Sequence, residues 1–362
     1  MLPALDTPQK ILVALSGGVD SSVCAALLVE QGHEVIGVTC VFCRDEAAGI
    51  ASPDASSIER ARGVATQLGI AHHVVDVQEC FERNVLVPFA RGYAAGQTPN
   101  PCVVCNPGAK FAALVEAMDA YGCSALATGH YAFVDTEGNL LRAADGTKDQ
   151  SYFLYRVPGD VLARVVFPLA GITKEQVRHI ARDKGLSVAE TPESQDVCFA
   201  GVNGSGYKAI IRRYAPGAFA PGDIVDEKGC VLGVHTGIAN YTIGQRKGLG
   251  IAAPEPLYVT SINAARNQVV VGGVAALARN RIAAGDIIIR SPLVGPVEQL
   301  TIKIRHGMEP VGARVRIDPA ASGDPSQARI ICDLDTPVSG VAPGQSLVCY
   351  RGDVTVCGGI IT

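Results

Sequence analysis

The residues best suited to chemistry come early in the chain, where an apolar stretch runs into a pair of glycines. Lys10–Leu15 is predicted to form a strand, Ser16-Gly17-Gly18 follows it, and a helix is predicted to open at Asp20-Ser21. Glycines let backbone N–H groups approach a ligand, and a helix N-terminus adds unpaired donors and a partial positive charge. The pattern therefore predicts a phosphate-binding loop, although a tight turn with an Asp or Ser N-cap would also satisfy it.

Two familiar phosphate-binding patterns are absent from this junction. The sequence has neither the Gly-x4-Gly-Lys-Ser/Thr spacing of the Walker loop nor the Gly-x-Gly-x-x-Gly of dinucleotide-binding folds. Asp20 closes the predicted loop at the point where a Mg²⁺ ion bridging phosphate groups would sit. The loop is thus predicted to bind a nucleotide by a pattern that is neither the Walker loop nor the dinucleotide-binding loop.

Two further segments carry candidate nucleophiles. Gln97–Asn106 contains Cys102 and Cys105, and its prolines predict a loop. Glu193–Phe199 places Cys198 in a polar segment that we expect to be exposed. A lone Cys-x-x-Cys can be half a metal site, a redox pair or incidental, and a zinc site would need a second pair that this sequence lacks. Four other cysteines lie in apolar patterns and are expected to be core residues: Cys24, Cys123, Cys332 and Cys349.

The first part of the chain alternates between predicted strands and predicted helices. The strands are expected at 10–15, 35–42, 73–77 and 125–128, and the helices at 20–31, 57–68, 111–120 and 173–184. Strands separated by helices form βαβ units, which favours a parallel sheet covered on both faces. We therefore expect an α/β domain with a Rossmann-like parallel sheet over residues 1–205.

The residue pattern changes from helical periodicity to short β-rich pieces after about residue 205. Gly/Pro turns become frequent, and short β-rich pieces follow at 257–262 and 268–272. Beyond residue 276 the pattern alternates, with strands expected at 300–305, 313–317, 329–334, 346–350 and 354–357. The sequence thus predicts a central β-rich domain at 206–275 and a C-terminal antiparallel β-barrel at 276–362.

Composition limits the classes of function. The chain has 362 residues, of which 48% are hydrophobic and 18% charged, and this hydrophobic content excludes a disordered chain. The formal net charge of −4 argues against non-specific polyanion binding by bulk charge but leaves a local basic face open. No apolar run is long enough for a membrane span and no secretory signal opens the chain, so a cytoplasmic protein with no membrane partner is expected. Most of the twelve cysteines are expected to be reduced and buried, with a few free to do chemistry. The absence of Trp and only 5% aromatic residues argue against extensive base-stacking platforms.

Several motifs, taken together, resemble a known family. The loop at 16–22 resembles the PP-loop of ATP pyrophosphatases, which cleave ATP between the α and β phosphates and transfer AMP to an acceptor oxygen. With both cysteine segments, Ala127–Tyr131, Lys148–Leu154, Tyr241–Gly250, Ala342–Ser346 and Gly358–Ile361, the chain resembles the tRNA-specific 2-thiouridylase family over nearly its whole length. The resemblance implies a tRNA-uridine 2-sulfurtransferase.

In that family, ATP and Mg²⁺ adenylate the C2 oxygen of the wobble uridine in the anticodon loops of tRNAs for Lys, Glu and Gln. A cysteine persulfide, loaded by a cysteine desulfurase or a sulfur-relay protein, then attacks C2 and AMP departs. By motif, Cys198 would carry the persulfide, and Cys105 would resolve it through a disulfide or help to hold a cluster. A thiolate near a phosphate-binding helix end is expected to be favoured in its ionised form.

The resemblance also implies residues that contact the nucleotide and the tRNA. The nucleotide set is Ala14, Leu15, Ser16, Gly17, Gly18, Val19, Asp20, Ser21, Cys40 and Gly129. The tRNA set is Asn100, Pro101, Cys102, His130, Lys148, Asp149, Gln150, Arg305, His306 and Gln345. Residues 276–362 carry nine Lys or Arg against eight Asp or Glu, so bulk charge supports RNA binding only weakly. Recognition by shape and by a flipped base is therefore expected.

One departure from the family leaves two routes open. Many members carry Asp where this chain has Cys102, so a carboxylate role cannot be assigned there. Cys102, Cys105 and Cys198 could instead ligate a [4Fe–4S] cluster with one open iron, which could bind and activate sulfide. Two other functions fit parts of the sequence. A PP-loop amide ligase or amidotransferase would use the same loop on a small molecule, and a non-enzymatic iron–sulfur or zinc protein would use only the cysteines.

Overall fold

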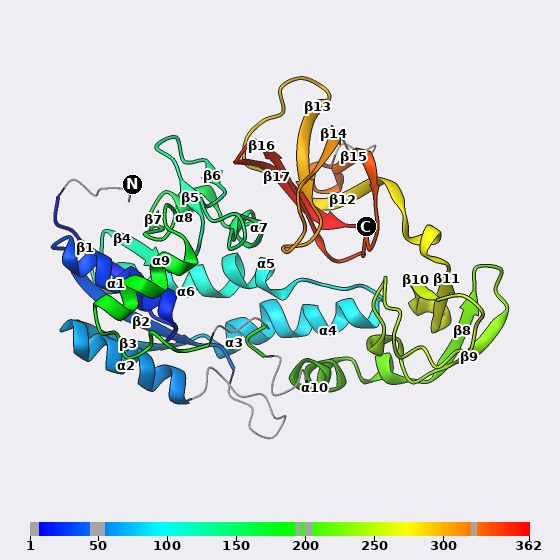
Figure 1. Cartoon of the computed structure of the whole chain (residues 1–362), viewed down its shortest axis with the longest axis horizontal. Helices are drawn as coiled ribbons and strands as arrows, with labels where there is room; N and C mark the ends of the chain where they lie inside the picture. Colours follow the sequence, from blue (N-terminus) through cyan, green and yellow to red (C-terminus); the bar gives the residue numbers. More distant parts are fainter. Residues whose placement is uncertain (1–6, 44–54, 193–196, 200–204, 320–323) are drawn as a thin grey trace. The chain divides into compact units, whose positions relative to one another are not determined.

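A computed structural model describes residues 7–43, 55–192, 197–199, 205–319 and 324–362 (Figure 1). The chain forms two compact units. The first comprises Met1–Val85, Cys102–Gly206 and Asp353–Thr355, and the second comprises Leu86–Pro101, Tyr207–Gly352 and Val356–Thr362. Among the described helices, none is both long and apolar enough to cross a bilayer.

The first unit is built on a parallel five-stranded sheet in the order β3-β2-β1-β4-β7. The strands are β1 (Lys10–Ala14), β2 (Glu34–Val41), β3 (Ala71–Asp76), β4 (Ala125–Thr128) and β7 (Val165–Val166). Strands β1, β2 and β4 are predominantly buried, as the apolar runs predict for a sheet with both faces covered. The expected Rossmann-like α/β fold is confirmed.

Side chains of β1 alternate between two helical layers. Ile11 and Val13 pack with residues of α1 (Val19–Glu30) and α2 (Ala55–Leu68), whereas Leu12 packs with α6 (Phe111–Ala120). This is the period-two alternation of a strand, and each face needs its own apolar helix stripe. In Figure 1 these helices lie along the sheet. The alternation fixes the end of β1, and hence the loop that follows it, in a rigid core.

Helix α5 (Pro101–Cys105) corrects one prediction, because the prolines of Gln97–Asn106 do not keep the whole segment in a loop. Pro101 opens the helix, where its missing N–H group costs nothing. The π-helical turn η3 (Asn106–Lys110) then joins α5 to α6. The carbonyl of Gly108 in that turn accepts hydrogen bonds from Asn84 Nδ2 (2.7 Å) and Cys80 Sγ (3.0 Å), which stabilises the irregular backbone.

The first unit contains further short elements. They are α3 (Gln78–Phe81), the π-helical η2 (Glu82–Leu86), β5 (Phe133–Val134), β6 (Leu140–Leu141), α7 (Ser151–Leu154), α8 (Gly159–Leu162) and α9 (Lys174–Asp183). Thr173 and Gln176 form a capping box at the start of α9, an arrangement typically worth about 1 kcal/mol to a helix. Two helices lie at the boundaries of the units, α4 (Val87–Ala94) and α10 (Ser205–Tyr214).

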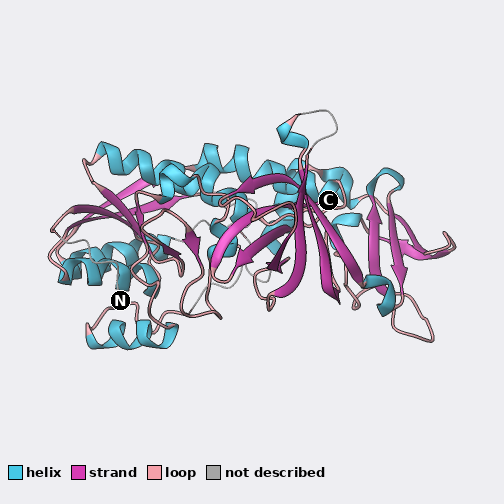
Figure 2. Cartoon of the chain, turned by 90° about the horizontal axis from the view of Figure 1, so that it is seen from above, coloured by secondary structure: helices cyan, strands magenta, loops and turns pink. Residues whose placement is uncertain are grey.

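The second unit contains two β structures, drawn as strands in Figure 2. A four-stranded sheet has the order β10-β11-β8-β9, from Tyr258–Asn263, Gln268–Gly272, Gly222–Asp226 and Val231–His235. Six antiparallel strands close into a barrel in the order β12-β15-β14-β13-β16-β17, and β17 pairs back with β12. These are Arg279–Ile289, Arg329–Val338, Val311–Asp318, Glu298–Lys303, Ser346–Arg351 and Val354–Ile361. The central β-rich region and the C-terminal barrel are thus confirmed.

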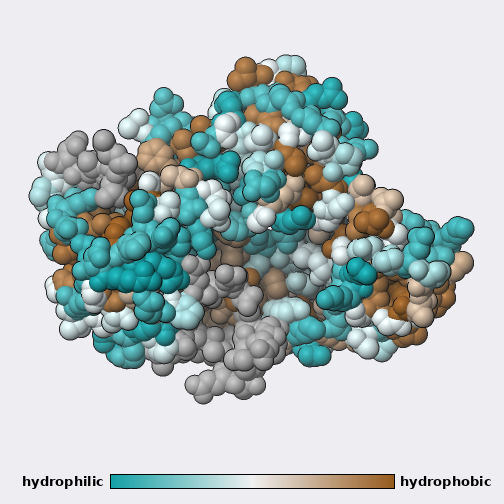
Figure 3. Space-filling view, in the orientation of Figure 1, coloured by the Kyte–Doolittle hydropathy of each residue, from teal (hydrophilic) through white to brown (hydrophobic). Residues whose placement is uncertain are grey.

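Cysteines contribute to the barrel core. Cys332, Cys349 and Cys357 are fully buried among its aliphatic side chains, which confirms the core role expected for Cys332 and Cys349. The edge strand β9 instead exposes Val231, Leu232 and Val234. Figure 3 shows apolar surface among polar residues over this part of the second unit.

Candidate functional site

The predicted loop lies at the topological switch point of the parallel sheet. The chain leaves β1 toward β2 and β3 on one side, and later enters β4 and β7 on the other. In open α/β sheets, ligands bind outside the carboxyl ends of the strands where the order reverses. Ser16–Ser21 follows β1, and Gly129 and His130 follow β4, so both segments flank this position.

Hydrogen bonds hold the loop in a closed turn. Ser21 Oγ accepts from the Ser16 N–H (3.1 Å) and lies 3.0 Å from Ser16 Oγ. The carbonyl of Gly18 accepts from Ser22 Oγ at 2.8 Å and from Ser21 Oγ at 3.2 Å. Gly17 has a φ of +74°, a conformation that side chains rarely adopt. The serines of the pattern therefore shape the loop, and the glycine permits its turn.

The N-terminus of α1 is available as an anion-binding end. Gly18 is the N-cap residue of this helix, and no side chain in the described structure caps it. The alternative interpretation of the sequence, an Asp or Ser N-cap, is therefore not realised. Uncapped N–H groups at a helix start, together with the helix dipole, favour a phosphate. Val19 and Leu15 are buried, so only their backbone groups face a ligand in this loop.

Gly129 is required by close packing against α1. A Cβ atom at Gly129 would lie 2.7 Å from the Ser21 nitrogen and 2.9 Å from the Asp20 carbonyl carbon. The end of β4 therefore contacts the first turn of α1 directly. Gly129 is predicted to lie against the nucleotide, and in this structure the lack of a side chain there lets the segment after β4 pack against the first turn of α1.

Three cysteines of the first unit form one electrostatic cluster, Cys102, Cys105 and Cys198. Cys105 is buried, and desolvation raises the pKa of its thiol to about 12. Cys198 is exposed as a residue, as predicted, yet desolvation of its sulfur and the neighbouring Cys105 and Cys102 raise the pKa of its thiol. Burial also raises the pKa of Cys102. Burial therefore opposes the ionised thiolates that we expect, and its effect on each pKa is larger than that of the nearby positive charge.

Lys110 supplies the positive charge of this cluster. Its ammonium group lowers the pKa of Cys102, Cys105 and Cys198, opposing the larger effect of burial. Its Nζ lies 3.4 Å from His130 Nε2, and His130 Nδ1 lies 2.8 Å from Thr128 Oγ1. Desolvation and Lys110 hold the pKa of His130 well below its usual range, so His130 is neutral at pH 7. Lys110 ends the π-helical turn, a backbone irregularity that is frequent at functional sites.

We expect Lys110→Met to slow the alkylation of Cys105 and Cys198 on the order of tenfold at fixed pH, as a further rise of about one pKa unit would. In the unchanged protein, alkylation should accelerate as pH rises, because both pKa values lie above neutrality. Mass spectrometry after timed iodoacetamide labelling measures both rates. Lys10→Met is the matched control, because Lys10 instead lowers the pKa of Cys123. Equal labelling rates in the two variants would contradict the role of Lys110.

The other residues of the first unit that are predicted to contact the nucleotide or the tRNA differ in how deeply they are buried. Desolvation raises the pKa of Cys40, on β2, to about 11. Asp149 is buried, and its carboxylate accepts from the Ala143 and Ser151 N–H groups and from Ser151 Oγ. Its role in this structure is to shape the loop, because a carboxylate so enclosed does not face RNA. Gln150 Oε1 accepts from the Tyr131 N–H at 3.0 Å, while Lys148 is half-buried.

The other predicted tRNA contacts lie in the second unit: Asn100, Pro101, Arg305, His306 and Gln345. Gln345 Nε2 donates to the Thr98 carbonyl at 2.7 Å, and the Thr98 N–H donates to the Pro343 carbonyl at 2.8 Å. Arg305 is exposed and its Nη1 donates to the Ser339 carbonyl. Gln345 thus fixes the segment before α5 within this unit.

Three residues near the loop were missed by sequence reasoning. Lys174 and Tyr131 bind the Asp20 carboxylate, and Arg60 Nε donates to the Gly17 carbonyl at 3.1 Å. Tyr131 ends the Ala127–Tyr131 motif, and Lys174 is the second residue of the helix predicted at 173–184, but neither position implies a role. No local signal identifies them, because Lys174 is 154 positions from Asp20 in sequence.

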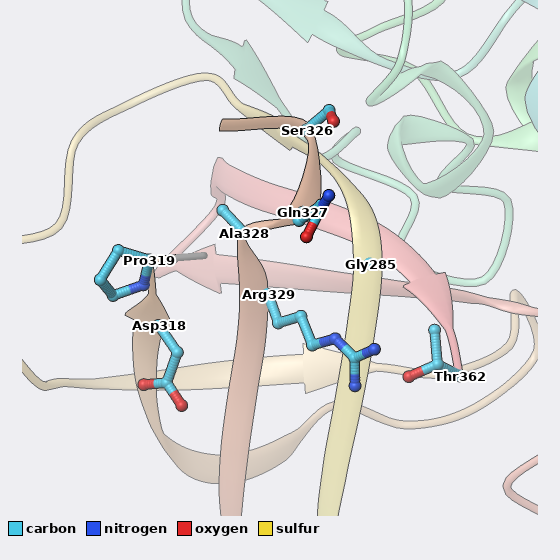
Figure 4. Close-up of a pocket in the computed structure, with 8 residues that line it drawn as sticks. All are labelled: Gly285, Asp318, Pro319, Ser326, Gln327, Ala328, Arg329 and Thr362. Atoms are coloured by element: carbon cyan, nitrogen blue, oxygen red, sulfur yellow. The ribbon is translucent and has the colours of Figure 1, made fainter. Parts of the chain in front are cut away.

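Within the part of the chain that the structure describes, neither a metal-binding group nor a separate pocket offers an alternative site built on these cysteines. Among the described residues, no group of three His, Cys, Asp or Glu side chains is arranged to hold a metal ion. Figure 4 shows a pocket of about 490 Å³ in the second unit, with Asp318 and Arg329 among its lining residues. None of its lining residues belongs to the predicted site, and it contains no thiol.

Three family models match the chain in succession. Residues 9–202 match a "tRNA methyl transferase HUP domain", 208–273 a "tRNA methyl transferase PRC-barrel domain", and 291–361 an "Aminomethyltransferase beta-barrel domain". The first model alone covers more than half of the chain.

Curated relatives match over nearly the full length. The chain is similar to the tRNA-specific 2-thiouridylase MnmA of Rhodospirillum rubrum (43% identity, covering 97% of this chain and 95% of the relative). It is also similar to the protein of the same name from Heliobacterium modesticaldum, at 41% identity over 98% of this chain and 92% of the relative. The protein of the same name from Magnetococcus marinus matches at 43% identity over 98% of this chain and 99% of the relative.

Solved structures match more distantly. An NMN synthetase from Francisella tularensis matches at 16% identity with a TM-score of 0.34, covering 57% of this chain and 76% of that one. A 4-thiouridine synthetase in complex with RNA and bound ATP matches at 16% with a TM-score of 0.36, covering 57% and 50%.

Proposed function

The chain belongs to the tRNA-specific 2-thiouridylase family, and on that premise we propose that it replaces the C2 oxygen of a wobble uridine in tRNA with sulfur. The enzyme is a tRNA-uridine 2-sulfurtransferase that uses ATP. It differs from a PP-loop amide ligase in needing a nucleophilic thiol. The expected sites of action are the tRNAs for Lys, Glu and Gln, in the cytoplasm.

One observation carries the proposal most directly. The unit that holds the phosphate loop also holds Cys198, whose electrostatic neighbours are Cys105, Cys102 and Lys110. An enzyme that adenylates a carbonyl oxygen and then replaces it needs both a nucleotide site and a nucleophile. A ligase that adds ammonia has no use for two thiols beside each other, and a non-enzymatic metal protein has no use for the loop.

The proposed reaction consists of two displacement steps and one thiol–disulfide exchange. The C2 oxygen attacks the α-phosphorus of ATP, and pyrophosphate leaves. The outer sulfur of a Cys198 persulfide attacks C2, and the C2–O bond breaks with release of AMP. The Cys105 thiol then attacks the Cys198 sulfur, which leaves 2-thiouridine and a Cys105–Cys198 disulfide. An external thiol reductant returns the disulfide to two thiols, and a persulfide donor recharges Cys198.

The chain's own groups support these steps in different ways. The uncapped N–H groups at Gly18 and the start of α1 would hold the phosphates, with Ser16 and Ser21 shaping the loop. Mg²⁺ would enter with ATP as part of the substrate. Burial and the neighbouring thiols raise the pKa of Cys105 and Cys198, and the positive charge of Lys110 lowers it. Because ATP and tRNA are anionic and would oppose a thiolate, Lys110 is the group of this chain that would favour ionisation during turnover.

The persulfide route fits the cysteines better than the cluster route. Cys105 and Cys198 form no disulfide in this structure, so both are present as the thiols that the exchange between them requires. A [4Fe–4S] cluster would need Cys102, Cys105 and Cys198 to converge as ligands. Among the described residues no such three-ligand group is formed, so no step is assigned to a cluster. Cys102 is then a neighbour that raises the pKa of both reacting thiols.

We assign the tRNA to contacts from both units. His130, Lys148 and Gln150 would contribute from the first unit, and Asn100, Pro101, Arg305, His306 and Gln345 would contribute from the second. The C-terminal barrel (276–362) would bind tRNA largely by shape, because its charge is nearly balanced. A cysteine desulfurase or a sulfur-relay protein would load Cys198.

Formation of AMP and pyrophosphate tests the proposal. We expect both products only when ATP and a tRNA with a wobble uridine are present together, because the acceptor oxygen belongs to the RNA. Thin-layer separation of the products of α-labelled ATP measures AMP, and the same separation with γ-labelled ATP measures pyrophosphate, each with and without tRNA. Product formation that needs a small carboxylate and ammonia instead of tRNA would identify an amide ligase and refute the proposal.

A further inference from the structure

The Asp20 carboxylate, in the first turn of α1, is bound by a lysine from a distant helix. Lys174 Nζ lies 2.6 Å from Asp20 Oδ1 and 2.7 Å from Oδ2. The Lys174 side chain is 11% exposed, while that of Asp20 is 33% exposed. A partly buried ion pair of this geometry depends on both members, because removal of one leaves an uncompensated charge.

The pair is anchored by a second hydrogen bond and by fixed backbone. Tyr131 Oη donates to Asp20 Oδ1 at 2.9 Å, and the Tyr131 N–H donates to Gln150 Oε1 at 3.0 Å. Lys174 is the first residue of α9, and its N–H donates to Asp145 Oδ2 at 3.0 Å. Both groups that hold Asp20 are therefore tied to the 145–150 segment and do not depend on a flexible side chain alone.

The position of Asp20 poses an electrostatic problem for a nucleotide site. A carboxylate in the first turn of α1 is attracted by the helix dipole, but it repels the phosphates that the same helix end would bind. Either a metal ion or a basic side chain must compensate it. In this structure Lys174 contacts both carboxylate oxygens, and Tyr131 takes a further position on Oδ1.

The expected Mg²⁺ site at Asp20 does not fit this arrangement. Both oxygens already accept hydrogen bonds, and among the described residues no three acidic, His or Cys side chains gather to hold an ion. Direct ligation by Asp20 would require Lys174 to leave the carboxylate. Mg²⁺ that enters with ATP can be held by phosphate oxygens and water instead.

We propose that Lys174 is a positioning residue of the nucleotide site, which fixes Asp20 in one conformation and cancels its charge so that ATP phosphates can occupy the N-terminus of α1. The inference rests on the proposed function only in taking ATP as the ligand. Lys174 acts through Asp20 and need not contact the phosphates itself. Loss of Lys174 is therefore harmful mainly because Asp20 remains charged.

This dependence gives a double-variant test in which the second change rescues the first. Lys174→Met should weaken ATP binding roughly tenfold or more, and Asp20→Asn added to it should recover most of that loss, because a neutral amide needs no counter-charge. Lys174→Arg should bind ATP within about threefold of the unchanged protein. Isothermal titration of the full chain with ATP, with and without Mg²⁺ and without tRNA, measures each dissociation constant.

Controls separate this role from a structural one. Lys184→Met removes a lysine that pairs with Glu30 at the surface (2.9 Å) and should leave ATP binding unchanged. Thermal unfolding of each variant verifies that it is folded. Unchanged ATP binding in Lys174→Met, or a loss that Asp20→Asn fails to recover, would overturn the inference. If the unchanged protein itself bound no ATP, the proposed function would fail instead.

Discussion

Cys198→Ser is expected to abolish the transfer of sulfur to tRNA while ATP binding stays intact. A serine oxygen cannot carry a persulfide, so the atom that attacks C2 is never delivered. Removal of a covalent nucleophile typically lowers turnover on the order of 10⁴-fold or more. The loop at Gly17–Ser21 makes its hydrogen bonds without Cys198, so the nucleotide site should survive. Thionucleoside content by mass spectrometry and ATP titration by calorimetry measure the two effects.

Cys230→Ser is the matched control for that variant. Cys230 is also an exposed free cysteine, but it belongs to the second unit. The Cys230→Ser variant should retain sulfur transfer at the level of the unchanged protein. Sulfur transfer retained by Cys198→Ser would refute the assignment of the persulfide to this residue.

Gly17→Ala is expected to remove most ATP binding, by about 100-fold or more. The new Cβ would lie 2.2 Å from the Ser57 carbonyl oxygen of α2, and the residue would keep a φ of +74°. A left-handed conformation alone costs a non-glycine residue roughly 1–2 kcal/mol, and the clash with backbone adds to it. The loop must therefore move, which displaces the N–H groups that would meet the phosphates.

Gly159→Ala tests whether this effect is local. Gly159 begins α8, and a Cβ there would meet no atom within 4 Å. It should leave ATP binding unchanged, and thermal unfolding should verify that both variants fold. If Gly17→Ala unfolds the protein, Gly129→Ala provides the second test, because its Cβ would lie 2.7 Å from the Ser21 nitrogen in the first turn of α1. Normal ATP binding by a folded Gly17→Ala variant would contradict our description of the loop.

The parts of the site that could be predicted from sequence are those built from neighbouring residues. Lys10–Leu15 and the serines and glycines after it specify a strand, a turn and a helix within about a dozen positions, so period and turn chemistry suffice. The same holds for the barrel strands, whose alternation is local. Cys198 stood out because its surroundings are polar.

The parts that could not be predicted depend on residues brought together by the fold. Lys174 meets Asp20 only because α9 packs beside α1, and a lysine at a helix start carries no sign of its partner. The high pKa values of Cys105 and Cys198 come from desolvation, which spacing does not reveal. Pro101 predicts a loop as readily as a helix start, because proline is suited both to turns and to the first turn of a helix.

The central claim is that sulfur reaches C2 of a wobble uridine through Cys198. The most direct measurement supplies a donor with isotopically labelled sulfane sulfur, ATP and unmodified tRNA, and analyses the nucleosides by mass spectrometry. We predict that labelled 2-thiouridine forms at the wobble position and that a trapped intermediate carries the label on the peptide containing Cys198. Labelled 2-thiouridine without any label on that peptide, or no thionucleoside at all, would contradict the account.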